Sequence, residues 1–122
     1  MKRLIYISVL SVVFLAIASA AFAQTTQQIF NTKIAEYEVG VKRNVPATAQ
    51  TSFNAAMTMI TDEINSLNQQ IQNTTNPGLI ATLTAKKNSL QQYFNDLQSL
   101  QSNLTGNFTQ IMTKMHDAAV LL

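Results

Sequence analysis

The chain contains no cysteine, and it has only one histidine, two prolines and three glycines among its 122 residues. Without cysteine there is no disulfide framework, no thiolate metal ligand and no lipoprotein anchor. A lone histidine, His116, is a poor start for a metal site, because such sites need several ligands. Glycines at 40, 78 and 106 are too far apart for a phosphate-binding loop. We therefore expect neither a metal nor a cofactor.

Charged residues are also scarce, at 11% of the chain. The formal net charge of +2 comes from Lys2 and Arg3, because residues 24–122 hold six basic and six acidic side chains. This balance gives no electrostatic footprint for nucleic acid or anionic lipid. Neighbouring acids such as Asp62 and Glu63 point in different directions on a helix, so they do not form an acid–base pair. With no serine near a histidine either, we expect no catalytic residues and no enzymatic activity.

The first 23 residues have the pattern of a secretory signal peptide. Lys2 and Arg3 precede an apolar run from Leu4 to Ile17, and small residues at Ala21 and Ala23 suit a signal peptidase. We expect cleavage before Gln24, with Ala18-Ser19-Ala20 as a second candidate site. The chain is thus predicted to be exported, periplasmic or secreted, with one domain at 24–122 and no membrane span after cleavage.

Residues 24–122 are predicted to be all-helical, in three segments. The first runs over 24–44 and opens with a capping box from Thr25 and Gln28. Pro46 interrupts the apolar pattern, and a second helix follows over 47–73. The stretch from Asn73 to Gly78 reads as a turn, in which Asn76 caps a third helix beginning at Pro77. That helix is predicted to continue to Leu122 with a bend at most near Gly106, since its heptad pattern continues through the glycine.

A heptad seam runs along the second and third segments, and it is the strongest pattern in the chain. It predicts a face for helix–helix association, and we take it as the candidate interaction site. Its members are Phe53, Met57, Ile60, Ile64, Leu67, Leu83, Leu90, Phe94, Leu97, Leu104, Phe108 and Ile111.

A short turn makes the flanking helices antiparallel neighbours. With its midpoint near Thr75, residue i lies level with residue 150 − i, and Pro46 comes close to Gly106. This register predicts three ion pairs between opposite charges, namely Glu63–Lys87, Glu36–Lys114 and Lys33–Asp117.

Two architectures satisfy this register. In the first, which we expect, the first two helices lie along a long third helix as an extended hairpin with bends near Pro46 and Gly106. In the second, the ends fold back at these bends into a four-helix bundle. A thin hairpin of 99 residues buries only a weak core, so the extended form would need to pair with a second copy.

The function predicted from these patterns is that of an exported, non-enzymatic structural or interaction protein. It would associate through its apolar seams with itself or with a helical partner. The alternatives are a periplasmic holdase and a four-helix protein that binds an apolar ligand or haem. In the haem case, His116 and either Met57 or Met59 would be the two axial ligands. In the extended hairpin, His116 and Met57 are too far apart to bind one haem.

Overall fold

The computed structural model describes residues 24–122, and the predicted signal peptide lies outside these residues. The described part is all-helical, with four α-helices that pack against one another. Their bounds are α2 Thr26–Lys42, α3 Pro46–Gln72, α4 Pro77–Leu100 and α5 Phe108–Ala119, with a short 3₁₀ turn, η1, at Gln101–Asn103.

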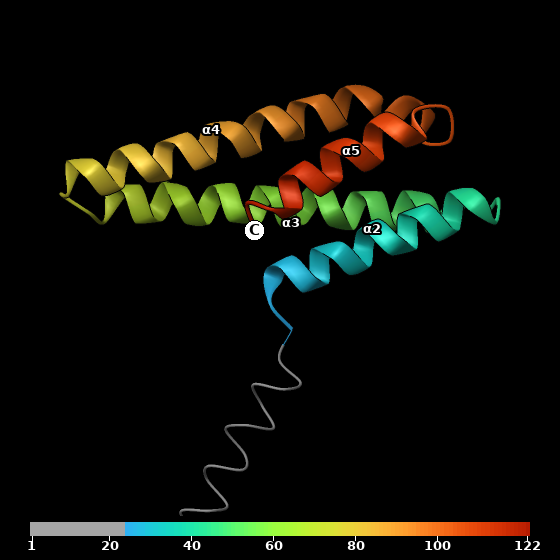
Figure 1. Ribbon diagram of the computed structural model, residues 1–122, viewed down its shortest axis with the longest axis horizontal. Coiled ribbons are helices and arrows are strands. Elements are labelled where there is room, and N and C mark those ends of the chain that lie inside the picture. Colours follow the sequence, from blue (N-terminus) through green and yellow to red (C-terminus); the bar gives the residue numbers. More distant parts are fainter. Residues whose placement is uncertain (1–23) are drawn as a thin grey trace, which may run out of the picture.

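The helices are arranged in two layers. The antiparallel hairpin of α3 and α4 forms one layer, and the shorter α2 and α5 form the other (Figure 1). Both corners, at 43–45 and 101–107, lie at the same end of the molecule, while the α3–α4 turn lies at the opposite end. The chain is therefore folded back into a four-helix bundle, which was the alternative that the sequence allowed.

The expected extended hairpin is wrong in two respects: α2 folds back along α3, and the long third helix is broken into α4 and α5. The helix ends at Leu100, and the seven residues 101–107 reverse the chain direction before α5. Asn103 and Asn107 stabilise this corner, because the Asn103 side chain accepts from the Gly106 N–H at 2.8 Å and the Asn107 amide donates to the Leu100 carbonyl at 3.0 Å. Side chains that bind nearby backbone groups in this way compete with helix formation.

The three predicted helix starts are confirmed to within two residues. Thr25 and Gln28 form the capping box of α2. The Asn76 side chain accepts from the N–H groups of Gly78 and Leu79 at the start of α4, and Pro77 is its first residue. Pro46 begins α3, where its missing N–H costs nothing.

The corner between α2 and α3 is a Schellman motif centred on Asn44. The Val45 N–H donates to the Gly40 carbonyl at 2.8 Å, and the Asn44 N–H donates to the Val41 carbonyl at 3.2 Å. Asn44 has φ of 54°, the left-handed conformation that this motif requires after the helix. Val45 and Pro46 then start the next helix. This corner turns α2 back along α3. The sequence pattern had instead predicted that these two helices lie one after the other along a long third helix.

Asn44 supports a first prediction. Replacement by alanine should lower the free energy of unfolding by about 1 kcal/mol, since left-handed backbone is unfavourable for a side chain that cannot bond locally. Replacement by glycine should leave stability unchanged or raise it slightly. Urea unfolding of both variants measures the difference. Equal stability of the alanine and glycine variants would show that the left-handed conformation at this corner is not required.

Candidate interaction surface

The predicted seam forms the core of the bundle. Leu83, Phe94, Leu104 and Phe108 are half-buried against this core, and the other eight seam residues are buried. The seam is therefore occupied within the chain by the helices that fold back. An external partner has to use a different surface from most of these residues.

Tyr37 is a residue of α2 that lies where the two layers meet the 101–107 corner. It is fully buried, and its ring stacks on Phe108 at 5.8 Å and tilts against Phe53 at 6.4 Å. Its hydroxyl donates to the Leu104 carbonyl at 2.5 Å. Tyr37 thereby joins α2 to α3, to α5 and to the 101–107 corner.

Burial also raises the pKa of Tyr37 to about 12. The phenol is favoured in the folded chain, so its contribution to stability is complete below about pH 10 and is lost as the pH rises towards 12. Tyr37→Phe should remove this part of the alkaline loss of stability. Urea unfolding of both proteins from pH 9 to 12 tests this, and parallel curves would contradict it.

The ion pairs between helices involve different partners from those that the register predicted. Glu63 pairs with Lys86 at 3.3 Å, one residue away from the predicted Lys87. Lys114 pairs with Asp96 at 3.1 Å, where the register predicted Glu36, because α5 folds back along α4.

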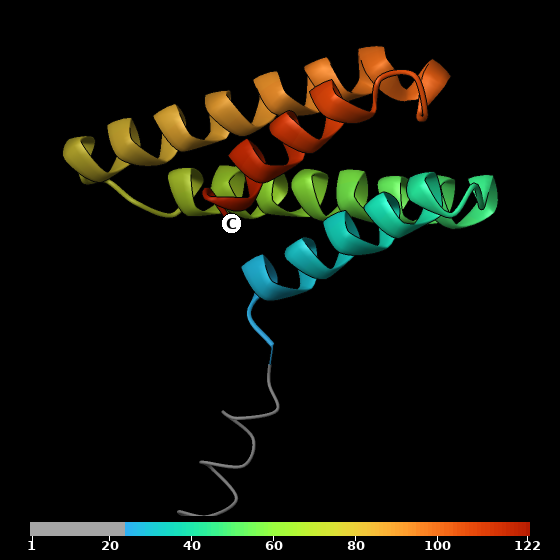
Figure 2. The same cartoon turned by 45° about the vertical axis from the view of Figure 1, so that its right-hand side comes forward.

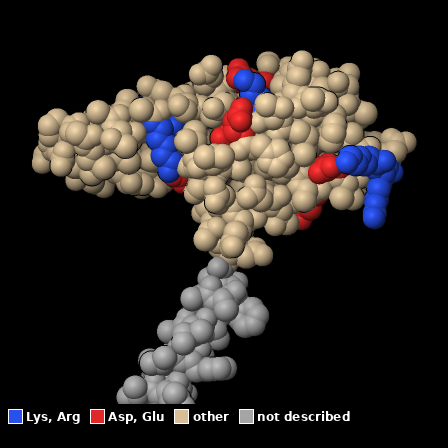
Figure 3. All heavy atoms as spheres, in the orientation of Figure 1, with Lys and Arg blue, Asp and Glu red and all other residues tan. Residues whose placement is uncertain are grey.

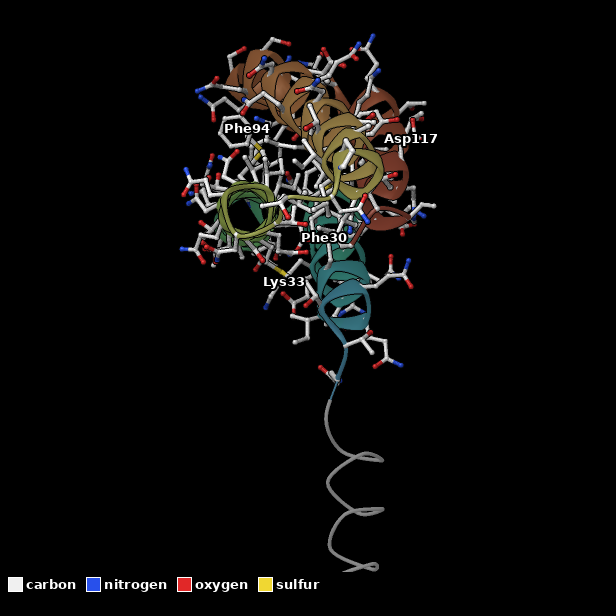
Figure 4. All side chains as sticks on the ribbon, turned by 90° about the vertical axis from the view of Figure 1, so that its left-hand side faces the viewer. Phe30, Lys33, Phe94 and Asp117 are labelled. Carbon is white, nitrogen blue, oxygen red and sulfur yellow. The ribbon has the colours of Figure 1, made fainter. Side chains whose placement is uncertain are left out.

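The third predicted pair, Lys33 with Asp117, is not formed. Lys33 pairs with Glu36 on its own helix at 3.3 Å, and the buried Ser52 donates to the same Glu36 oxygen at 3.3 Å. Asp117 is exposed on α5, and Figure 4 shows Lys33 and Asp117 on opposite sides of the bundle.

The α3–α4 hairpin projects beyond the other layer. α3 has 27 residues against 17 in α2, and α4 has 24 against 12 in α5. At 1.5 Å per residue, about 15–18 Å of the hairpin extends past the shorter helices. Figures 1 and 2 both show this end as two helices alone. We call residues 64–85 the arm.

The arm carries no charged residue, although residues 24–122 hold twelve in total. Twelve of its 22 residues are Asn, Gln, Ser or Thr. Figure 3 shows this end of the molecule without coloured atoms, up to the cations where the arm leaves the bundle. The arm is therefore a neutral, amide- and hydroxyl-rich projection.

One face of the arm would be covered if α2 and α5 were longer. Tyr93 on α4 lies against Lys114 of α5, and helical spacing from Tyr93 places Leu79, Leu83 and Lys86 on this face. The Glu63–Lys86 pair crosses its base from α3 to α4. We call it the uncovered face.

Apolar side chains stand at both ends of the uncovered face. Leu79, near the tip, is 46% exposed. At the other end the second layer stops, where the Gln27 side chain donates to the Ala119 carbonyl and joins the start of α2 to the end of α5. Val120, exposed by 76%, directly follows Ala119 at this junction. Two of the five large exposed hydrophobic residues of the described part, Leu79 and Val120, thus lie at the two ends of the uncovered face.

Other candidate sites offer less chemistry. An open groove of about 390 Å³ between α4 and α5 is lined by seven residues, of which Lys114 and Asp96 form an ion pair. His116 is exposed, and Met115 takes the adjacent core position. Among residues 24–122, no three potential metal-binding His, Asp or Glu side chains gather, and no helix has both the length and the hydropathy of a membrane span.

Comparisons with known proteins add no family. No family model, no curated protein and no solved structure matches the chain.

The surface that the sequence reasoning missed is the uncovered face. Its signal was the 22-residue run without charge, which lies between the charged flanks at Glu63 and Lys86.

Proposed function

We propose that the protein is an exported, non-enzymatic interaction protein that binds a helical segment along its arm. The observation that carries this proposal is the projecting α3–α4 hairpin, whose uncovered face has a partly exposed apolar stripe. Elsewhere in the bundle the equivalent stripe is covered by α2 or α5. A helix of similar polarity could cover the arm in the same way, by packing side chains into its groove.

The remainder of the bundle would serve as a scaffold. Its core is filled by the chain's own apolar residues, and in the described part every buried side-chain nitrogen or oxygen has a hydrogen-bond partner. A folded, closed bundle holds the arm rigid, which lowers the entropy cost of binding. Export of the protein is part of the proposal, and it predicts that the processed chain begins at Gln24.

Photocrosslinking in a bacterial host that exports the protein tests the proposal. A benzophenone amino acid at Leu79 should give discrete adducts, because this side chain lies on the uncovered face. The matched control is Val39 on α2, which is 43% exposed and far from the arm. Adducts at Leu79 with none at Val39 support the proposal. Their absence at Leu79, or equal adducts at both positions, would overturn it.

A further inference from the structure

The partner that fits the uncovered face is a second copy of the same chain. We infer that two molecules dock arm to arm, antiparallel, so that each arm fills the space left beside the other's short layer. This inference rests on the proposed function and names its partner. It follows from lengths, from charge and from the positions of exposed apolar residues.

The arm and the free space beside it have the same length, because both are set by how far the α3–α4 layer extends beyond the α2–α5 layer. The arm extends about 15–18 Å beyond α2 and α5, so the space beside it has the same length as the arm itself. In an antiparallel pair, the arm of one copy occupies that space in the other, and the centre becomes a four-helix bundle of two α3 and two α4 helices. A parallel pair would force the α2–α5 layers of both copies into the same place. The antiparallel pair is closed and two-fold symmetric, and it leaves room for both layers.

Charge is compatible with the antiparallel pair. The Glu63–Lys86 pair lies at the base of the arm, and the contact between these residues sets Leu83 level with Ser66 and Leu79 level with Gln70. Antiparallel docking brings the base of one arm against the neutral tip of the other, so like charges do not meet. The 22 uncharged residues offer no repulsion between two arms and no attraction for a polyanion.

The apolar residues meet across the pair. We place the two-fold axis at the level of Leu83, so this residue faces Leu83 of the second copy. Leu79 reaches the partner's base, beside the stems of the ion-paired residues. The tip around Pro77 approaches the partner's Val120, which is exposed in the single chain.

The surface is small, so the pair should be weak. The uncovered face and its end wall offer fewer residues than the roughly 20–30 per partner of a standard interface. We therefore expect a dissociation constant of about 10–100 µM, in the range of transient complexes.

Sedimentation equilibrium of the protein purified from the exported fraction tests the pair. A monomer–dimer equilibrium is expected, and Leu79→Glu should raise the dissociation constant at least about tenfold. An acid in the first turn of α4 is favourable for the helix, so folding should be retained. The control Val39→Glu, at a side chain of similar exposure, should change the constant less than about twofold. A monomer up to about 1 mM, or equal effects of both variants, overturns the inference.

Cysteine crosslinking tests the geometry independently, because the chain has no native cysteine. Thr82, next to Leu83, lies towards the uncovered face, and Ala81 at the same level lies on nearly the opposite side of α4 from Leu79; both are exposed. Oxidation should link Thr82→Cys across the two-fold axis, since a disulfide needs close Cα atoms, and should leave Ala81→Cys unlinked. Equal crosslinking of both would overturn the antiparallel arrangement. A monomeric protein that still forms a Leu79 photoadduct with another protein would sink this inference alone, leaving the proposed function intact.

Discussion

Replacing Tyr37 by alanine should lower the free energy of unfolding by about 4 kcal/mol, within the range of about 3–5 kcal/mol for truncation of a buried aromatic residue. The ring contacts Phe53 and Phe108, and its hydroxyl satisfies the Leu104 carbonyl. Its removal leaves a cavity among three helices and an unpaired carbonyl at the second corner. A domain of this size has a total stability of roughly 5–15 kcal/mol, so the variant should be close to unfolding.

Tyr37→Phe is the matched control for this prediction. It keeps the ring and removes only the hydrogen bond, so it should cost about 1–2 kcal/mol. Urea unfolding followed by circular dichroism measures both values. If the alanine variant were no less stable than the phenylalanine variant, the ring would not be packed between the layers, and the described position of α5 would be wrong.

The second large effect is expected at Gly40, where α2 and α3 approach most closely. A β-carbon at this position would lie 2.6 Å from the backbone nitrogen of Ala49. Backbone atoms cannot move aside as a flexible side chain can, so Gly40→Leu should force the two helices apart. We expect a loss of at least about 3 kcal/mol, which exceeds the gain of about 1 kcal/mol in helix propensity.

Gly78→Leu is the control, because a β-carbon at Gly78 meets only the Asn76 side chain, at 3.4 Å. This variant should unfold within about 1 kcal/mol of the unmodified protein. Thermal and urea unfolding compare the two. Equal stability of the Gly40 and Gly78 variants would contradict close packing of α2 against α3.

The helices themselves were predictable because their ends carry local signals. Thr25, Pro46 and the Asn76-Pro77 pair each act through their own backbone neighbours, so their effect needs no tertiary information. The all-helical class followed in the same way from the apolar spacing. These features are confirmed in the described residues.

The corner at 101–107 was not predicted, because its length leaves the heptad pattern unchanged. It takes seven residues, the length of one heptad, so Leu97 before the corner and Ile111 after it remain in phase. Apolar periodicity reports which side chains face a core, and it does not report the direction in which the helix runs. The local signal was the cluster of Asn103, Gly106 and Asn107.

The candidate interaction site was placed on residues that are buried, for a related reason. Strong seam residues such as Leu90 and Leu97 were taken as a surface for partners, but the folded-back helices bury them. The close approach of α2 to α3 depends on Gly40 and Ala49, with Ser52 and Ala56 also buried on α3. Small residues at helical spacing were the available signal for that contact. The uncovered face then depends on where α2 and α5 end, which only the tertiary structure shows.

The folded-back arrangement is the central claim, because it creates both the core and the arm. Its most direct test is the distance between spin labels at Gln92→Cys and His116→Cys, two exposed sites on α4 and α5. Packed antiparallel helices lie about 8–10 Å apart, so double electron–electron resonance should give a distance of about 20 Å or less, label arms included. A continuous helix through Gly106 would separate these sites by about 36 Å, and a distance near that value would contradict the account.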